Sequence, residues 1–205
     1  MLYCDPLTSL VAYPSFEQHL IDLLPTLAAD ELHIAIGDVD GLREYVMERR
    51  AVDPYSFGHL AGNACMRTVG ALTVEWAATE LKEVGFHICG TFGGDEVIIA
   101  AAGTSHEAFT QKVNVLARDM KASSPRPVSF ALATSKPCVL DPADARNAYR
   151  MLVSAVDAEL FAVKGSARFA GGHLEGVVID LGAISLVERP GVDDIEEAVT
   201  IGGGR

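Results

Sequence analysis

The chain has 205 residues, of which 49% are hydrophobic and 21% charged, an ordinary balance for a single domain with a sizeable core. Its formal net charge of −12 argues against broad contact with a DNA or RNA duplex or an anionic membrane, but it leaves room for a small anion held by local cations and a metal. No apolar run is long enough to span a membrane, and residues 1–5 lack the features of a signal peptide. We therefore expect a cytoplasmic protein.

The first half of the chain predicts three helices around one buried strand. Apolar residues recur at helical spacing after Pro14, which suits the first turn of a helix, and again over two later segments. Asp53, Pro54 and Gly58 mark a loop between those two segments. In chain order we expect a turn-rich start at 5–10, a helix from Pro14, a strand at Leu32–Val39, a helix at 41–50, a loop at 51–58 and a long helix at 59–84.

The second half predicts a hairpin, two more helices and two more strands. Thr104 and Glu107 stand at the spacing of a capping box, which marks the start of a helix. A later segment alternates apolar with small or polar residues, which is typical of a half-buried strand. After the hairpin we expect a helix from 104–107 to a break at 123–127, a strand at 128–133, a helix at about 142–164 stopped by Gly165, and a strand at 176–181.

This order of elements indicates an α+β fold, with helices packed against a mainly antiparallel sheet. We expect residues 1–187 to form one domain, because neither a composition shift nor an internal repeat divides them. Residues 188–205 are acidic and end in glycines, so we expect them to be a flexible tail.

A Gly-Gly pair joins two strand-like runs near the middle of the chain. Adjacent glycines fit a tight hairpin turn, because such a turn needs positive φ. Asp95 and Glu96 follow Gly93 and Gly94 at the start of the second strand, with their side chains on opposite faces of the sheet. Two carboxylates beside such a turn suit a hard divalent cation and an approaching phosphate, although a solvated hairpin tip would show the same residues.

A second acidic cluster ends the Leu32–Val39 strand. If this strand end and the hairpin are neighbours, Asp38 could meet Asp95 and Glu96 around one or two metal ions. Taken alone, Asp38 and Asp40 fit a strand-end turn and a helix N-cap equally well. The metal site therefore depends on the two clusters lying together.

Two cations and an asparagine complete the candidate site. Lys164 and Arg168 could hold the outer phosphates of a triphosphate by charge-assisted hydrogen bonds. Each also has an ordinary explanation, since cations complement the dipole at a helix C-terminus and Asn63 suits the first turn of the long helix. The prediction of phosphoryl or nucleotidyl transfer thus rests on the co-occurrence of these groups.

Together the segments resemble the GGDEF family, the diguanylate cyclases. Five motifs occur in the family's order, and the name motif differs only by Val97 in place of Phe. In this sequence they are DPLTSL at 5–10 for D-x-L-T-G-L, DVD at 38–40 for D-[IV]-D, GHLAGN at 58–63 for G-H-x-x-G-D, GGDEV at 93–97, and residues 156–168 for A-D-x-A-L-Y-x-A-K-x-x-G-R.

The resemblance implies a ferredoxin-like palm that joins two GTP molecules into cyclic di-GMP, with half of the active site from each subunit of a homodimer. It implies that Asp38, Asp95 and Glu96 are the catalytic acids and bind Mg²⁺ or Mn²⁺ with the Val39 carbonyl. Glu96 is also the candidate to help activate the 3′-hydroxyl. The nucleotide-binding positions that carry over are Gly41, Leu42, Arg43, Asn63, Gly93, Gly94, Lys164 and Arg168.

The positions that read guanine in the family differ in this chain. Val46 stands in direct register with the family's guanine-reading Asn, and Pro54 is the alternative if the extra residues of the loop are counted. Asn63 replaces the second reader, an Asp; its amide offers one acceptor and one donor group, which weakens selection of guanine. The RxxD inhibition motif is also absent, since Val84 and His87 occupy those positions.

Three functions remain open from the sequence. A metal-dependent cyclase that makes cyclic di-GMP is favoured, because the acidic and phosphate-binding positions are intact. A second candidate keeps the fold but makes another cyclic (oligo)nucleotide or processes GTP otherwise, as in the minimal CRISPR-type polymerases and the archaeal GTP cyclohydrolase that a lone palm domain also resembles. The third is a degenerate module that binds a nucleotide or a partner without turnover, which Val97 and the altered readers suggest.

Overall fold

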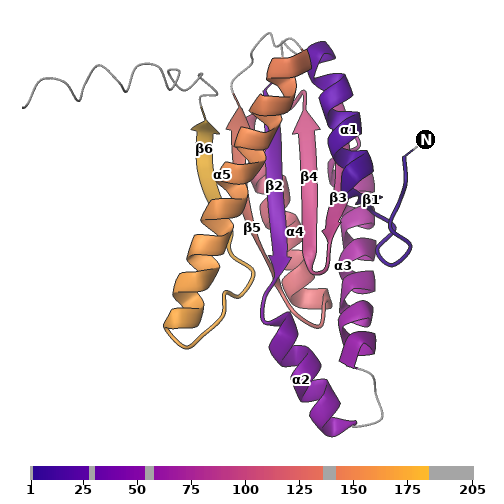
Figure 1. The fold of residues 1–205 in the computed structure, drawn as a ribbon, viewed down its shortest axis with the longest axis vertical. Coiled ribbons are helices and arrows are strands. Elements are labelled where there is room, and N and C mark those ends of the chain that lie inside the picture. Colours follow the sequence, from indigo (N-terminus) through magenta and orange to yellow (C-terminus); the bar gives the residue numbers. More distant parts are fainter. Residues whose placement is uncertain (1, 28–30, 54–57, 136–141, 185–205) are drawn as a thin grey trace, which may run out of the picture.

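The computed structural model describes residues 2–27, 31–53, 58–135 and 142–184. A six-stranded sheet in the order β1-β3-β4-β2-β5-β6 lies between two layers of helices (Figure 1). In chain order the elements are β1 (Val11–Ala12), α1 (Tyr13–Leu23), the 3₁₀ helix η1 (Leu24–Thr26), β2 (Leu32–Val39), α2 (Leu42–Val52), α3 (Gly58–Glu80), β3 (Phe86–Gly93), β4 (Glu96–Ala102), α4 (His106–Ser123), β5 (Val128–Ser135), α5 (Pro142–Phe169) and β6 (Val178–Ile184).

The four central strands pair antiparallel, and a parallel strand is added at each edge. β3, β4, β2 and β5 form the antiparallel part, whereas β1 pairs with β3 and β6 pairs with β5 in parallel. This arrangement confirms the predicted mainly antiparallel sheet flanked by helices. None of the described helices is both long and apolar enough to cross a membrane.

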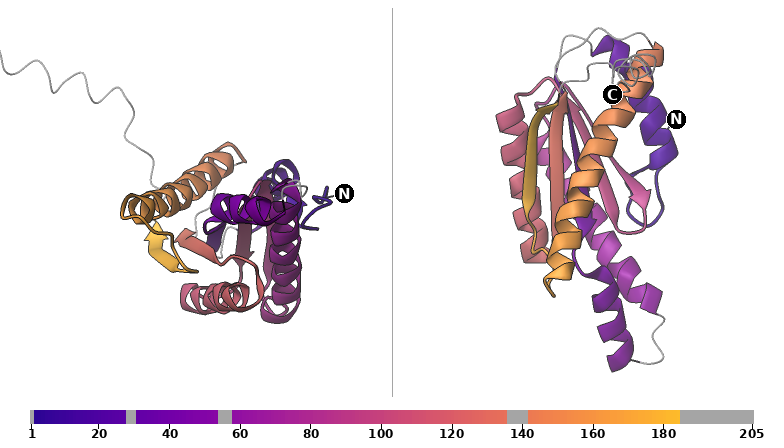
Figure 2. Two further views of the ribbon diagram at one scale, coloured as in Figure 1. Left: turned by 90° about the horizontal axis from the view of Figure 1, so that it is seen from below. Right: turned by 60° about the vertical axis from the view of Figure 1, so that its left-hand side comes forward.

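Each face of the sheet carries its own hydrophobic cluster. Helices α1 and α5 cover one face, and α3 and α4 cover the other (Figure 2). Along β2 the side chains alternate between the two clusters: Ile34 and Ile36 pack under α1 and α5, whereas Ala35 and Val39 pack under α3 and α4. This alternation continues to the end of the strand and places Asp38 on the α5 side.

β5 is more deeply buried than its sequence pattern predicts. All eight of its residues are buried, although the alternation at 128–133 predicts a half-buried strand. The prediction was wrong because β5 lies between β2 and β6 and is covered by α4 and α5, so that its alanines and Ser129 are as inaccessible as Phe130.

The last helix continues past the glycine that was expected to stop it. α5 runs to Phe169 and therefore includes Gly165 and Arg168. A glycine inside a helix costs about 1 kcal/mol relative to alanine. Burial of Leu160 and of the Lys164 side chain in the turn before Gly165 offsets this cost, and the continued helix carries both predicted phosphate-binding cations.

Other helix ends differ by smaller amounts. Ser105, not Thr104, caps α4, and its Oγ accepts a hydrogen bond of 3.2 Å from the Ala108 N–H. α2 extends to Val52, into the segment predicted to be a loop, and α3 ends at Glu80 instead of continuing to residue 84. The predicted tail at 188–205 and the alternative guanine reader Pro54 lie outside the described residues.

Candidate functional site

Two residues connect β3 to β4, and the backbone of this turn has positive φ angles that favour glycine. Gly93 pairs with Glu96, and Gly93 and Gly94 have φ of 98° and 71°. The Thr91 side chain fixes the turn, because its Oγ accepts from the Gly93 N–H (3.0 Å) and donates to the Glu96 carbonyl (2.8 Å). Asp95 lies in the turn itself, not on the strand as predicted, and Glu96 is the first residue of β4.

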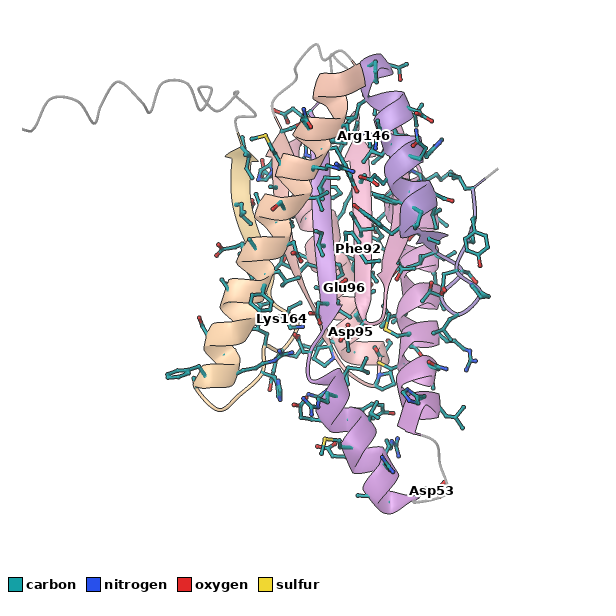
Figure 3. The ribbon with its side chains drawn as sticks, in the orientation of Figure 1. Asp53, Phe92, Asp95, Glu96, Arg146 and Lys164 are labelled. Atoms are coloured by element: carbon teal, nitrogen blue, oxygen red, sulfur yellow. The ribbon has the colours of Figure 1, made fainter. Side chains whose placement is uncertain are left out.

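The end of β2 lies directly beside this turn. Asp38 is the cross-strand partner of Glu96, and the Val39 N–H donates to the Asp95 carbonyl over 3.1 Å. Paired residues of neighbouring strands point to the same face of a sheet, so the carboxylates of Asp38 and Glu96 both face α5. The structure thus brings the two acidic clusters of the sequence together (Figure 3).

Lys164 reaches from α5 into the end of β2. Its residue is only 6% exposed, and its ammonium donates to Asp38 Oδ1 (2.5 Å), to the Asp38 carbonyl (3.0 Å) and to the Val39 carbonyl (3.2 Å). Figure 3 shows Lys164 close to Glu96 and Asp95 at one end of the sheet, far from Arg146 at the other end of α5. Lys164 is therefore paired with the acids instead of projecting into solvent.

Asp40 also contacts the Lys164 ammonium. Its side chain is fully buried, and Oδ2 accepts hydrogen bonds from Ser129 Oγ (2.6 Å) and from the Gly176 N–H (3.0 Å). Oδ1 lies 3.1 Å from Lys164 Nζ but accepts no hydrogen bond of good geometry from the described residues. A single ammonium therefore faces two carboxylates, those of Asp38 and Asp40.

Burial and mutual repulsion raise the pKa of the two acids that face α5. Burial raises the pKa of Asp38, and the nearby Asp95 and Asp40 add to this effect, while the bond from Lys164 opposes it. Burial also raises the pKa of Glu96, followed by repulsion from Asp38 and from Asp157 on α5. These carboxylates are consequently better proton acceptors than exposed ones.

A small pocket of about 70 Å³ opens between these acids and α5. It places charged groups of both signs around one space, with Arg168 one helical turn beyond Lys164. Asp157, which the sequence reasoning did not single out, also lines this pocket and faces Glu96. Its lining residues are Asp38, Glu96, Asp157, Leu160, Phe161, Lys164, Gly165 and Arg168.

A larger pocket of about 330 Å³ lies on the opposite side of the turn, between α2 and α3. Asn63 and Val46 both line it, so the structure brings together the two residues that stand at the predicted base-reading positions. α2 and α3 come into contact here, since a Cβ on Gly62 would lie 3.4 Å from Val46 Cγ2. The lining residues are Leu42, Arg43, Val46, His59, Gly62, Asn63, Met66, Gly94 and Asp95.

Arg126 supports the loop between β2 and α2 and was missed from the sequence. Its Nε donates to the Asp40 carbonyl (2.8 Å), and its guanidinium fills the space where a side chain on Gly41 would lie. Gly41 has φ of 63° and is the N-cap of α2. Positive φ favours glycine here, and a side chain at residue 41 would also displace the Arg126 guanidinium. No short-range pattern links residue 126 to this loop.

The oxygens assigned to a metal suit a hard cation in their chemistry. The Asp38 carboxylate and the Val39 carbonyl are ligands of the kind that Mg²⁺ and Mn²⁺ prefer, and they already surround a cation, the Lys164 ammonium. Among residues 2–27, 31–53, 58–135 and 142–184, however, no three His, Cys, Asp or Glu side chains are grouped so as to hold a metal ion. A metal here would need Lys164 to move.

Comparison with known proteins identifies the fold. No model of a protein family matches the sequence, and no curated protein matches it. Among solved structures, the GGDEF domain of DgcB from Caulobacter crescentus, in complex with c-di-GMP, is 16% identical with a TM-score of 0.62 over 86% of this chain and 94% of that one. A microbial GGDEF domain described with cyclic di-GMP is 24% identical with a TM-score of 0.58 over 86% and 95%.

A third structure shows the same similarity within a longer protein. The diguanylate cyclase SiaD from Pseudomonas aeruginosa, in complex with its activator SiaC, is 16% identical with a TM-score of 0.64 over 86% of this chain and 61% of that one. The chain therefore has the fold of the GGDEF domains of diguanylate cyclases, as its motifs predict.

Proposed function

We propose that this chain is a metal-dependent nucleotidyl cyclase, with GTP as the favoured substrate and cyclic di-GMP as the favoured product. The observation that carries the proposal is the cross-strand pair of Asp38 and Glu96, which faces a buried Lys164 from α5. The larger pocket on the other side of the turn has room for a base. The fold, which GGDEF domains seen with c-di-GMP share, supports the same conclusion.

The proposed reaction joins two triphosphates by two equivalent steps. In each step the 3′-hydroxyl oxygen of one nucleotide attacks the α-phosphorus of the other, the hydroxyl proton is lost, and pyrophosphate leaves. Glu96 is the proposed base, because a carboxylate with a raised pKa is a better proton acceptor. Lys164 and Arg168 bind the phosphates from α5.

A divalent cation is part of this proposal. Bound Mg²⁺ or Mn²⁺ would offset the charge that develops on the phosphates. The Asp38 carboxylate and the Val39 carbonyl would hold it, and the Asp95 and Glu96 carboxylates would have to turn toward it, because these acids are not grouped as a metal site among the described residues. The backbone of Gly41 and Leu42 together with Arg43 would approach the same phosphates at the start of α2, where the helix dipole favours an anion.

The reaction also requires a second copy of the chain. In this proposal the acids and the pocket that contains Asn63 serve one nucleotide per chain, whereas the product is made from two nucleotides. A cytoplasmic homodimer with two facing half-sites supplies the second set.

A second candidate, a cyclase with another base, is favoured by one specific observation. Val46 and Asn63 line the same pocket, so both positions that read guanine in the family are altered within one space. A valine offers no hydrogen bond and an asparagine amide pairs with several bases. The product would then be a different cyclic nucleotide formed by the same acids.

The test is to incubate the pure protein with each of the four NTPs and Mg²⁺ or Mn²⁺ and to measure pyrophosphate release and product mass. Asp95→Ala should reduce turnover by at least about 10³-fold without lowering the melting temperature, because this side chain lies in a turn. Asp119→Ala, whose side chain is about half exposed on α4 and far from the site in sequence, is the matched control and should leave turnover unchanged. Nucleotide binding without pyrophosphate from any NTP would show a binding module instead of an enzyme.

A further inference from the structure

The predicted metal ligands and the predicted phosphate-binding lysine are in direct contact. Lys164 Nζ donates to Asp38 Oδ1 and to the Val39 carbonyl, which are two of the oxygens assigned to the metal. An ammonium and a divalent cation cannot occupy the same oxygens, because they repel each other and compete for the same lone pairs. Lys164 therefore has two incompatible positions, one on the acids and one on the phosphates.

We propose that Lys164 is the resident cation of the acidic site in the nucleotide-free protein, and that it excludes divalent metal until a triphosphate draws its ammonium away. The competition between Lys164 and metal follows from this chain's own contacts. Its release by a triphosphate rests on the proposed function. The consequence is an order of binding in which metal enters together with the nucleotide.

The contacts explain why the ammonium stays on the acids. Lys164 and Asp40 are both buried, and the ammonium is the cation that faces Asp40 Oδ1, which accepts no hydrogen bond within the described part of the chain. If Lys164 left alone, the carboxylates of Asp38 and Asp40 would lose their counter-charge, and breaking a buried pair in this way is costly. A divalent cation in the same place would restore the charge balance, so the two cations can exchange.

The surroundings of Lys164 also give the ammonium a second place to bind. Its side chain lines the pocket of about 70 Å³ that Arg168 shares one turn further along α5. A triphosphate in this pocket would offer Lys164 anionic oxygens in exchange for those of Asp38. The flexible four-carbon stem of lysine allows the move without a shift of the helix.

The experiment measures binding of Mn²⁺ alone by the full chain, with free Mn²⁺ counted by electron paramagnetic resonance. Lys164→Met should bind Mn²⁺ at least about fivefold more tightly than the unaltered protein, at the low end of typical coupling between two sites. Arg168→Met is the matched control: it removes the same charge from the same helix and pocket, so it reports general electrostatic attraction. Its gain should be clearly smaller than that of Lys164→Met.

Lys164→Gln provides a second variant if loss of the long side chain impairs folding. The amide keeps a hydrogen-bond donor but carries no charge, and it should also bind Mn²⁺ more tightly than the unaltered chain. Equal or weaker Mn²⁺ binding by folded Lys164→Met or Lys164→Gln, or an equal gain in Arg168→Met, would overturn the proposal. Turnover of NTPs is measured separately, on the unaltered chain. Tighter Mn²⁺ binding by the Lys164 variants, together with no turnover by the unaltered chain, would reject the cyclase and keep the competition between Lys164 and metal.

Discussion

The two pockets beside the β3–β4 turn are held together by different kinds of contact. On the α5 side Lys164 and Asp40 are buried and Asp38 is partly exposed. The Lys164 ammonium pairs with both carboxylates, so the loss of Lys164 leaves both acids without their counter-charge. On the α2–α3 side the walls are mostly apolar or neutral, as at Val46, Asn63 and Met66, and the space is larger. A change at the half-buried Val46 or Asn63 should therefore cost little stability.

This difference accounts for where the chain departs from the GGDEF motifs. Asp38, Asp95, Glu96, Lys164 and Arg168, which are predicted to serve phosphate chemistry, match the motifs, while Val46 and Asn63, which are predicted to read the base, do not. Charges that hold each other in place restrict substitution, whereas a half-buried wall between two helices accepts new side chains. The altered base readers are therefore compatible with an intact chemical centre.

The strongest way to test the comparison is to remove a buried charge on the α5 side. Asp40→Ala should lower the free energy of unfolding by about 3–5 kcal/mol, because buried Lys164 loses one of its two carboxylates and Ser129 and the Gly176 N–H each lose a hydrogen bond. Urea unfolding monitored by circular dichroism measures this loss. The matched control Asp22→Ala removes an exposed carboxylate on α1 and should change stability by less than about 0.5 kcal/mol. A loss at Asp40 as small as that at Asp22 would show that the network is not stabilising.

A second prediction concerns base selection on the α2–α3 side. Asn63→Asp restores two acceptor oxygens toward the N1–H and N2–H₂ groups of guanine and should raise the ratio of kcat/KM for GTP over ATP by about tenfold. Competition between the two nucleotides in one reaction measures the ratio. Met66→Leu changes the same wall without a polar group and should leave the ratio unaltered. An unchanged ratio in Asn63→Asp would place the base elsewhere.

Much of this arrangement was accessible from the sequence, for reasons that particular segments illustrate. Leu32–Val39 was predicted to its exact ends, because an apolar run that stops at two acids is a clear local signal. The hairpin followed from Gly93-Gly94, since the positive φ of a tight turn is a local requirement that adjacent glycines meet.

Features that depend on distant contacts were not accessible in the same way. Gly165 is a local signal for the end of a helix, and the prediction based on it was wrong. The helix continues because the Lys164 side chain is buried against β2, 126 residues away in the chain. The support of Gly41 by Arg126 spans 85 residues and leaves no periodic trace. The sequence also assigned Lys164 to phosphates and Asp38 to metal without indicating that the two side chains are bonded to each other.

The smallest expected effect is the pH dependence of stability that Glu96 causes in the α5-side pocket. Because the pKa of Glu96 is raised in the folded protein, by burial first and then by Asp38 and Asp157, its ionised form destabilises the fold. Protonated Glu96 therefore contributes stability, which is fully present below the pKa of Glu96 in the unfolded chain. This stability is lost as pH rises through the pKa of Glu96 in the folded protein. Glu96→Gln should therefore be more stable than the unaltered chain at pH 7–8, by less than about 1 kcal/mol, and this advantage should disappear as pH falls toward 4.

Unfolding in urea across this pH range, on both proteins, measures that difference. Gln111→Glu adds a carboxylate at an exposed position of α4, outside the site, and controls for the general effect of charge. The difference in free energy of unfolding between this variant and the unaltered chain should vary little between pH 5 and 8. A Glu96→Gln protein that is less stable at pH 8 would mean that the ionised Glu96 is held by favourable contacts. Glu96 would then lack the raised pKa that makes it a base, and the α5-side pocket would be a structural ion-pair network rather than a catalytic one.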